Sequence, residues 1–224
     1  MKYKAVIFDM DGVIFDSERF VLECWKEIAK REGIKDMEEV FHRCIGTNKH
    51  KTKEILLEHY GADFAYDIFQ KEASKLFHSR YDNGRLPMKT GVTKLLPYLK
   101  GQGFRIGLAS STRYEVVQQE LQDAGILSYF ESLTCGDMVK QSKPEPEIFL
   151  KACESLSVDA KEAIAIEDSF NGIRAAHRAG MLAVMVPDII APNEEMKQLA
   201  GKILNDLAEV KEWMEREIVV GGML

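Results

Sequence analysis

Two pairs of carboxylates follow two short apolar segments of the sequence. Asp9 and Asp11 come after one segment, and Glu167 and Asp168 come after another. Carboxylates this close repel one another, and their removal from water adds to the cost. A hard divalent cation with oxygen ligands would relieve that repulsion. Each pair alone also fits a solvated acidic turn or a helix cap, so the residues that accompany the pairs decide the interpretation.

Hydroxyl and lysine side chains at similar places could bind an anion. Ser110 and Ser111 follow the apolar residues 105–109, beside a predicted helix N-terminus, where backbone N–H groups suit a phosphate. Lys143 precedes Pro144, which fixes the backbone there, and its ammonium group could hold a phosphate oxygen. Taken singly, the serines fit a helix cap and the lysine fits a solvated side chain. Together with the carboxylates they indicate cation-assisted phosphate chemistry.

The segments that precede these side chains are typical of buried parallel strands, because they are continuously apolar rather than alternating. Helical periods separate them, and this alternation predicts an α/β fold with a doubly wound parallel sheet. Such sheets bind ligands at the carboxyl ends of their strands. We expect strands at 5–8, 105–109, 132–135, 163–166 and 182–186, and helices at 92–100, 114–124, 147–155, 172–179 and 207–216.

Residues 18–83 break this alternation. They contain no convincing strand and predict amphipathic helices at 19–31, 37–41, 52–60 and 64–80. The turn signal Asp82-Asn83-Gly84 follows, where the chain could return to the sheet. The sequence therefore predicts a catalytic core of residues 1–17 and 84–224, with an all-helical domain of residues 18–83 inserted after the first strand. We expect residues 221–224 to be frayed.

Composition limits the classes of function. The 224 residues are 46% hydrophobic and 29% charged, as in ordinary globular proteins. A net charge of −6 is a poor basis for binding nucleic acid or an anionic membrane. We find no signal peptide, and no window approaches the roughly 18 apolar residues of a membrane span. The four cysteines lack zinc or redox spacing, so we expect reduced thiols in a cytoplasmic protein.

The sequence resembles the haloacid dehalogenase superfamily of phosphotransferases over essentially its whole length. Four motifs carry the resemblance: FDMDGVIFDS at 8–17, LASST at 108–112, SKPEPEIF at 142–149 and IEDSFNGIRAAHRAGM at 166–181. The helical insertion is similar to the small cap of the β-phosphoglucomutase-like and phosphoglycolate-phosphatase-like subgroup. The resemblance implies a Rossmann-like core and a cap that opens and closes over the site.

The resemblance also implies roles for the four carboxylates. Asp9 would attack phosphorus and form an aspartyl-phosphate. Asp11 would protonate the leaving oxygen and then take a proton from the attacking water. Mg²⁺ would be held by the Asp9 carboxylate, the Asp11 backbone carbonyl and Asp168, with Glu167 as a direct or water-mediated ligand.

Other positions of the motifs would bind phosphate or form the hinge. Ser110 and Lys143 would bind the transferring phosphoryl oxygens, assisted by the Ser111 backbone N–H. Asp16 and Ser17 would mark the hinge between core and cap.

A turn in the helical insertion is a candidate for substrate binding. In the resemblance, Gly46, Thr47, Asn48 and Lys49 face the active site. Basic residues flank or follow this turn and could hold the far end of a small anionic metabolite, although a solvated helix start explains them equally well. These residues are Arg43, Lys49, His50, Lys51 and Lys53.

The expected function is a Mg²⁺-dependent phosphatase, a monomer that acts on a small phosphorylated metabolite such as a sugar phosphate. The main alternative is a sugar-phosphate mutase. β-Phosphoglucomutases carry a histidine just after the first motif, and Glu18–Glu23 contains none, which favours hydrolysis.

Three further alternatives have less support. A dehalogenase attacks carbon and does not need Asp11 or the pair Glu167 and Asp168. A phosphonate hydrolase needs a cap lysine, and the cap has too many lysines for their number to decide. A non-catalytic binding protein of this fold would usually lack the nucleophile or the metal-binding acids, which are intact here.

Overall fold

The computed structural model describes residues 2–219 and contains a six-stranded parallel sheet. The strand order is β3-β2-β1-β4-β5-β6. The five expected strands are confirmed, whereas β6 was not expected because two residues carry no readable pattern. The strands are β1 (Ala5–Phe8), β2 (Arg105–Ser110), β3 (Ser132–Cys135), β4 (Ala163–Glu167), β5 (Leu182–Met185) and β6 (Lys202–Ile203).

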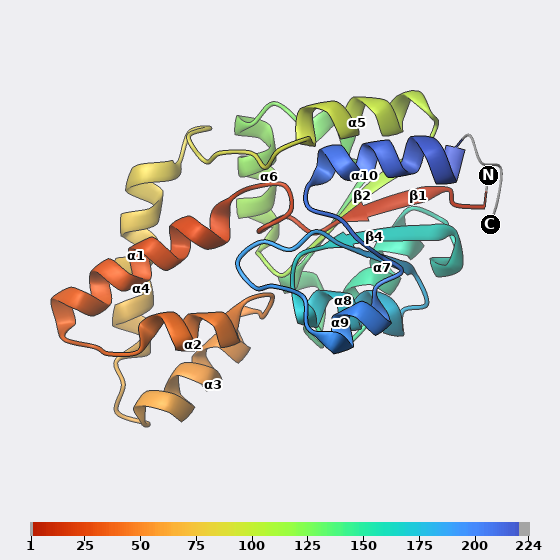
Figure 1. Ribbon diagram of the computed structural model, residues 1–224. Helices are drawn as coiled ribbons and strands as arrows, with labels where there is room; N and C mark the ends of the chain where they lie inside the picture. Colours follow the sequence, from red (N-terminus) through yellow and green to blue (C-terminus); the bar gives the residue numbers. More distant parts are fainter. Residues whose placement is uncertain (1, 220–224) are drawn as a thin grey trace.

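Helices cover both faces of this sheet. Along β1, Val6 and Phe8 pack into one hydrophobic core, and Ala5 and Ile7 pack into another. The first core is closed by α5 (Val92–Gly101), α6 (Tyr114–Asp123) and α10 (Leu207–Trp213), and the second by α7 (Glu147–Ser155), α8 (Phe170–Arg178) and α9 (Glu194–Leu199). Figure 1 shows α5 and α10 above the strands and α7, α8 and α9 below them. The predicted Rossmann-like, doubly wound α/β fold is confirmed.

Two details at the C-terminal side differ from expectation. The helix α9 was not expected, because its six residues are too few to show a clear period. The helix expected at 207–216 is α-helical only to Trp213 and continues as a π-helical stretch, Met214–Val219. Residues 221–224, for which we expect fraying, lie outside the described residues.

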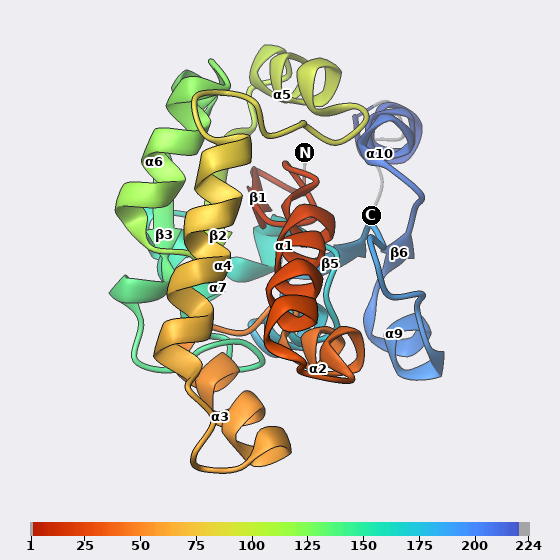
Figure 2. The same ribbon diagram turned by 90° about the vertical axis from the view of Figure 1, so that its left-hand side faces the viewer.

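Of the five helices between β1 and β2 in the sequence, the first four lie at the places expected for the insertion. They have a hydrophobic core of their own, in which the Trp25 ring meets Phe41 and Phe69 edge-on at centroid distances of 5.1 and 5.3 Å. Figure 2 shows α1 and α4 side by side in front of the sheet. The helices are α1 (Ser17–Glu32), α2 (Met37–Cys44), α3 (Lys49–Tyr60) and α4 (Tyr66–Tyr81).

The register of the sheet brings the candidate residues together. Phe8, the last residue of β1, lies opposite Leu108 of β2 and Ile166 of β4. Because all three strands are parallel, the residues that follow them emerge at one edge of the sheet. That edge faces the four helices of the insertion (Figure 1).

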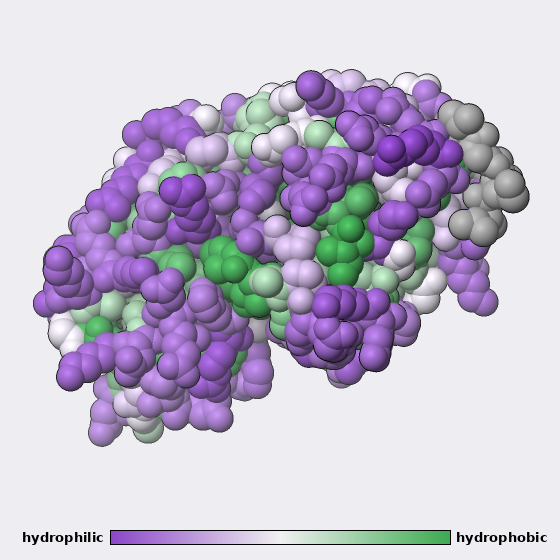
Figure 3. All heavy atoms as spheres, in the orientation of Figure 1, coloured by the Kyte–Doolittle hydropathy of each residue, from purple (hydrophilic) through white to green (hydrophobic). Residues whose placement is uncertain are grey.

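Among residues 2–219, no helix is both long enough and apolar enough to cross a bilayer. The face in Figure 3 is mostly hydrophilic, and it is indented between the part that carries α2 and α3 and the part that carries α9. All four cysteines are buried free thiols, as expected.

The close packing of α5 on α10 allows a prediction about stability. Gly91, with φ +95°, approaches α10 so closely that a Cβ would lie 2.2 Å from the backbone N of Ala208. Gly103 has φ +80° but nothing within 4 Å of its Cβ position. We expect Gly103→Ala to lower the free energy of unfolding by about 1–2 kcal/mol through backbone strain alone. Gly91→Ala should lower it by about 4 kcal/mol or more, because α10 must also move. Equal losses in urea titrations would contradict this.

Candidate active site

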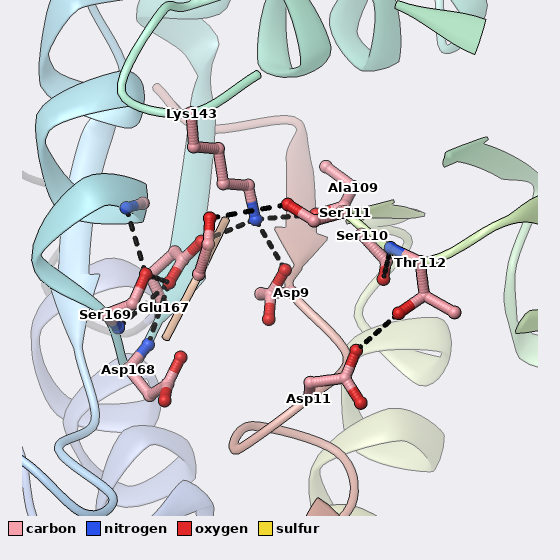
Figure 4. Close-up of polar contacts among 12 residues, drawn as sticks. Asp9, Asp11, Ala109, Ser110, Ser111, Thr112, Lys143, Glu167, Asp168 and Ser169 are labelled. Carbon is pink, nitrogen blue, oxygen red and sulfur yellow. Dashed lines mark hydrogen bonds and ion pairs between the residues drawn. The ribbon is translucent and has the colours of Figure 1, made fainter. Parts of the chain in front are cut away.

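A lysine buried between two carboxylates lies at the centre of the site. Lys143, in the loop before α7, places its Nζ 2.5 Å from Asp9 Oδ1 and 2.6 Å from Glu167 Oε1, and it donates to the Ala109 carbonyl at 3.0 Å. Figure 4 shows these three side chains converging. Burial by itself lowers the pKa of Lys143, but the two carboxylates outweigh it and raise the pKa above its ordinary value. The ammonium group is therefore charged.

Glu167 is the last residue of β4, and protein donors occupy both of its oxygens. Oε1 accepts from Lys143, while Oε2 accepts from the backbone N–H groups of Asp168 and Ser169 and from the Ser169 hydroxyl, at 3.0–3.1 Å. A Cβ on Gly172 would lie 1.8 Å from this carboxyl group. Glycine at this position of α8 therefore gives the carboxylate its space.

Asp9 and Asp168 retain free oxygens. In residues 2–219, no side chain or backbone donor reaches the Asp168 carboxylate, and Asp9 uses only Oδ1. One oxygen from each of Asp9, Glu167 and Asp168 lies within 4.8 Å of the others. Burial raises the pKa of both Asp9 and Asp168 well above the usual range, and neighbouring carboxylates raise it further. This buried set of oxygens suits a hard divalent cation such as Mg²⁺.

Asp11 is held from two sides. Its Oδ1 accepts from the Ser17 hydroxyl at 2.6 Å. Its Oδ2 accepts from the Thr112 hydroxyl at 2.8 Å, the bond drawn in Figure 4. Ser110 is fully buried, and its Oγ accepts from the Thr112 backbone N–H at 3.0 Å. Sequence reasoning grouped Thr112 with Ser110 and Ser111 as hydroxyls that suit a phosphate or cap a helix, and it missed the bond to Asp11.

The expected hinge lies where two linkers pair. The Asp16 backbone N–H donates to the Pro87 carbonyl, and the Lys89 backbone N–H donates to the Ile14 carbonyl, both at 2.9 Å. These bonds join the segment that leaves β1 to the segment that returns from α4. The placement of Asp16 fits a hinge, while the Ser17 hydroxyl reaches Asp11 itself.

A cavity of about 650 Å³ lies between this edge of the sheet and the helices of the insertion. Of the four residues expected at the cap turn, Gly46, Thr47 and Lys49 line it, together with Ser111 from the core. The Ser111 hydroxyl lies 3.5 Å from the Gly46 carbonyl, so core and turn meet here. Asn48 is different, since its side chain caps the N-terminus of α3.

The basic residues of the turn divide into two groups. Three of them are ion-paired at the surface, Arg43 with Glu58, Lys51 with Glu54 and Lys53 with Asp67, and the His50 ring contacts Glu54. Lys49 lines the cavity instead, as do Lys71 and Arg113, which sequence reasoning did not identify. Within the described part of the chain, these three side chains form no ion pair. These three cationic side chains are therefore the candidates for binding an anionic ligand.

Two carboxylates in the cavity wall were also missed. Glu18 of α1 lines the cavity, and burial followed by the charge of Asp11 raises its pKa well above the usual range. Glu120 of α6 has its Oε2 buried without a hydrogen-bond partner among residues 2–219. Burial, followed by the charges of Asp11, Asp82 and Asp123, raises the pKa of Glu120 to about 8.

Glu120 should make stability depend on pH. Because its folded pKa is raised, the protonated form stabilises the fold below the unfolded pKa of about 4.3, and this contribution is lost as pH rises towards 8. Between pH 5 and pH 8, the free energy of unfolding of the wild type should fall by about 1–3 kcal/mol more than that of Glu120→Gln, after allowance for the partial exposure of Glu120. Urea titrations at both pH values measure this. Glu115→Gln, at an exposed site on the same helix, should show the same change in the free energy of unfolding between the two pH values as the wild type.

Comparison with known proteins agrees with this geometry. Residues 6–186 match the model of the family described as haloacid dehalogenase-like hydrolase. A phosphorylated carbohydrates phosphatase of Thermotoga maritima is 32% identical over 178 residues, covering 80% of this chain and 82% of the relative. A β-phosphoglucomutase of Bacillus subtilis is 33% identical over 191 residues, covering 82% and 83%.

A solved structure shows the same architecture. A mutant of CbbY from Rhodobacter sphaeroides, in complex with xylulose-(1,5)bisphosphate, superposes with a TM-score of 0.78 at 26% identity, covering 92% of this chain and 96% of that one. The family match spans most of the sequence and includes the strands that carry the site. The chain therefore belongs to the haloacid dehalogenase-like hydrolase family.

Proposed function

We propose that the protein is a Mg²⁺-dependent phosphatase that hydrolyses a small phosphorylated metabolite, such as a sugar phosphate, through an aspartyl-phosphate. The observation that carries the proposal is the buried pair of Asp9 and Lys143 with Asp11 fixed beside it. Relatives named as phosphatases of phosphorylated compounds support it.

The chemistry needs one nucleophile and one acid. One Asp9 carboxylate oxygen forms a bond to phosphorus while the ester P–O bond breaks and Asp11 donates a proton to the departing oxygen. Water then attacks phosphorus, Asp11 accepts its proton, and the bond from phosphorus to Asp9 breaks to release phosphate. The two hydroxyl donors on Asp11, Ser17 and Thr112, keep its carboxyl group oriented for both transfers.

The residues present fit a divalent cation. The Asp9 and Asp168 carboxylates and the Asp11 backbone carbonyl would hold it, since the first two have free oxygens. Protein donors already occupy both Glu167 oxygens, so Glu167 would contribute indirectly, by orienting Lys143 and the loop after β4. When bound, the cation supplies the positive charge that lets a carboxylate approach an anionic phosphate.

Lys143 and Ser110 are suited to bind the transferring phosphoryl group. Lys143 offers a buried, charged ammonium beside the nucleophile. The Ser110 oxygen accepts a bond from the Thr112 backbone, which leaves its hydroxyl proton free to donate to a phosphoryl oxygen. The Ser111 backbone N–H would add a third donor.

The helices of residues 18–83 would act as a cap that selects the substrate. The three unpaired cations of the cavity come from α3, α4 and the segment after β2, so they could hold a second anionic group of the substrate. On α1, Val21 lines the cavity in the stretch where β-phosphoglucomutases carry a histidine. Hydrolysis is therefore favoured over phosphoryl transfer back to a sugar.

The catalytic proposal predicts the effect of Asp9→Asn. An amide is a poor nucleophile, so phosphate release should fall by about 10³-fold or more. Asp63→Asn, at an exposed position outside the cavity, should retain wild-type turnover. Near-wild-type turnover in Asp9→Asn would overturn the proposed mechanism, provided that circular dichroism shows both variants folded.

The same assay separates hydrolysis from isomerisation. With β-glucose 1-phosphate, Mg²⁺ and a trace of the 1,6-bisphosphate, one arm measures phosphate and the other glucose 6-phosphate. We expect phosphate without isomerisation, followed by a panel of phosphorylated metabolites. Isomerisation faster than release would identify a mutase.

The cavity cations predict a preference for substrates with two anionic groups. Lys49→Met and Arg113→Met should each raise KM for a sugar bisphosphate about tenfold, the value of one charge-assisted hydrogen bond. They should leave KM for the matching monophosphate within about twofold. Lys51→Met is the control, because Lys51 pairs with Glu54 and neither residue lines the cavity. Equal effects on both substrates would show that these residues do not bind the second anion.

A further inference from the structure

An acidic residue outside the family motifs lies next to the proposed cation site. Asp188 follows β5, and its side chain is 9% exposed. Its Oδ1 accepts from Lys89 Nζ at 2.5 Å. Its Oδ2 is buried and has no hydrogen-bond partner among residues 2–219. A buried carboxylate oxygen without a partner is costly, so a donor absent from the protein itself is expected there.

The free oxygen of Asp188 lies on the same side of Gly12 as Asp168. A Cβ built on Gly12 would be 2.4 Å from Asp168 Oδ2 and 3.3 Å from Asp188 Oδ2. The two carboxylate oxygens are therefore no further apart than these two distances together. A water bound to a cation on Asp168 could span such a gap, since a metal–oxygen bond is about 2.1 Å and a hydrogen bond about 2.8 Å.

Lys89 fixes the other oxygen of Asp188. Lys89 belongs to the linker that returns from α4, and its Nζ is also 3.6 Å from Asp16 Oδ1 in the linker that leaves β1. Its backbone is bonded to the outgoing linker at Ile14. Arg19, the other cation with an influence on Asp188, is exposed. The orientation of Asp188 is thus tied to both linkers.

We propose that Asp188 is a positioning residue for the divalent cation, whose free Oδ2 accepts a hydrogen bond from a cation-bound water while Lys89 holds Oδ1. The inference rests on the cation site proposed above at Asp9 and Asp168. Partners of this kind orient the inner ligands, and their loss costs 10–100-fold in metal affinity.

The test is the affinity for Mg²⁺, measured by isothermal titration calorimetry on the folded full-length protein without substrate. We expect Asp188→Asn to weaken binding about tenfold, because the amide has half the acceptors and no charge. Asp16→Asn removes the other carboxylate on Lys89 without touching the cation side and should change affinity less than about twofold. Lys89→Met leaves Asp188 Oδ1 without its donor and should also weaken binding, by less than Asp188→Asn does. Thermal melts without Mg²⁺ check that each variant is folded.

Each outcome has a distinct meaning. Weaker binding in Asp188→Asn with unchanged binding in Asp16→Asn supports the proposal, since mere loss of a nearby negative charge would weaken both alike. Unchanged affinity in Asp188→Asn, or equal weakening in Asp188→Asn and Asp16→Asn, overturns it. Absence of Mg²⁺ binding in wild type would overturn the cation site itself, and with it this inference.

Discussion

The burial of several carboxylates around one lysine is the constraint on which the rest of the structure depends. Taking charges out of water costs several kcal/mol each, and only close compensation makes it tolerable. Lys143 compensates Asp9 and Glu167 at once, which requires that the ends of β1 and β4 and the loop before α7 meet at one point. The parallel sheet provides that meeting, because β1 and β4 are neighbours in register.

The same constraint shapes the start of α8. Glu167 accepts two backbone N–H groups just before the helix, so its charge is stabilised by donors that would otherwise be unsatisfied. Gly172 must lack a side chain for the carboxylate to fit. Glu167 therefore ties the lysine to the helix, while Asp168 is left with oxygens free for a cation. Glu167 and Asp168 are adjacent in one motif, but they are suited to different roles because their hydrogen-bond partners differ.

The sequence predicted that the motif residues meet at the ends of strands, since strand ends and carboxylate pairs leave a local signature; the roles assigned to these residues stay predictions. Asp9, Lys143 and Asp168 could be identified because each follows an apolar run or precedes a proline. The contacts that orient them could not be, because they join residues far apart in the chain. Thr112 reaches Asp11 across 101 positions, and Lys89 reaches Asp188 across 99. Local patterns carry no information about such pairs, and the unpaired state of Lys49 likewise depended on where its neighbours found partners.

The cavity is lined by charges of both signs, and their arrangement bears on how the two parts of the molecule act together. Asp9, Asp11 and Asp168 line it from the core, while the unpaired cations come from both the insertion, at Lys49 and Lys71, and the core, at Arg113. An anionic group held between Lys49 and Arg113 would attract each towards the other. Binding energy from the non-reacting end of a substrate would then favour the closed arrangement, which excludes water and strengthens the electrostatic interactions at Asp9. A substrate without that group would lose this contribution, so selection at the far end of the cavity and reaction at the near end depend on the same contacts.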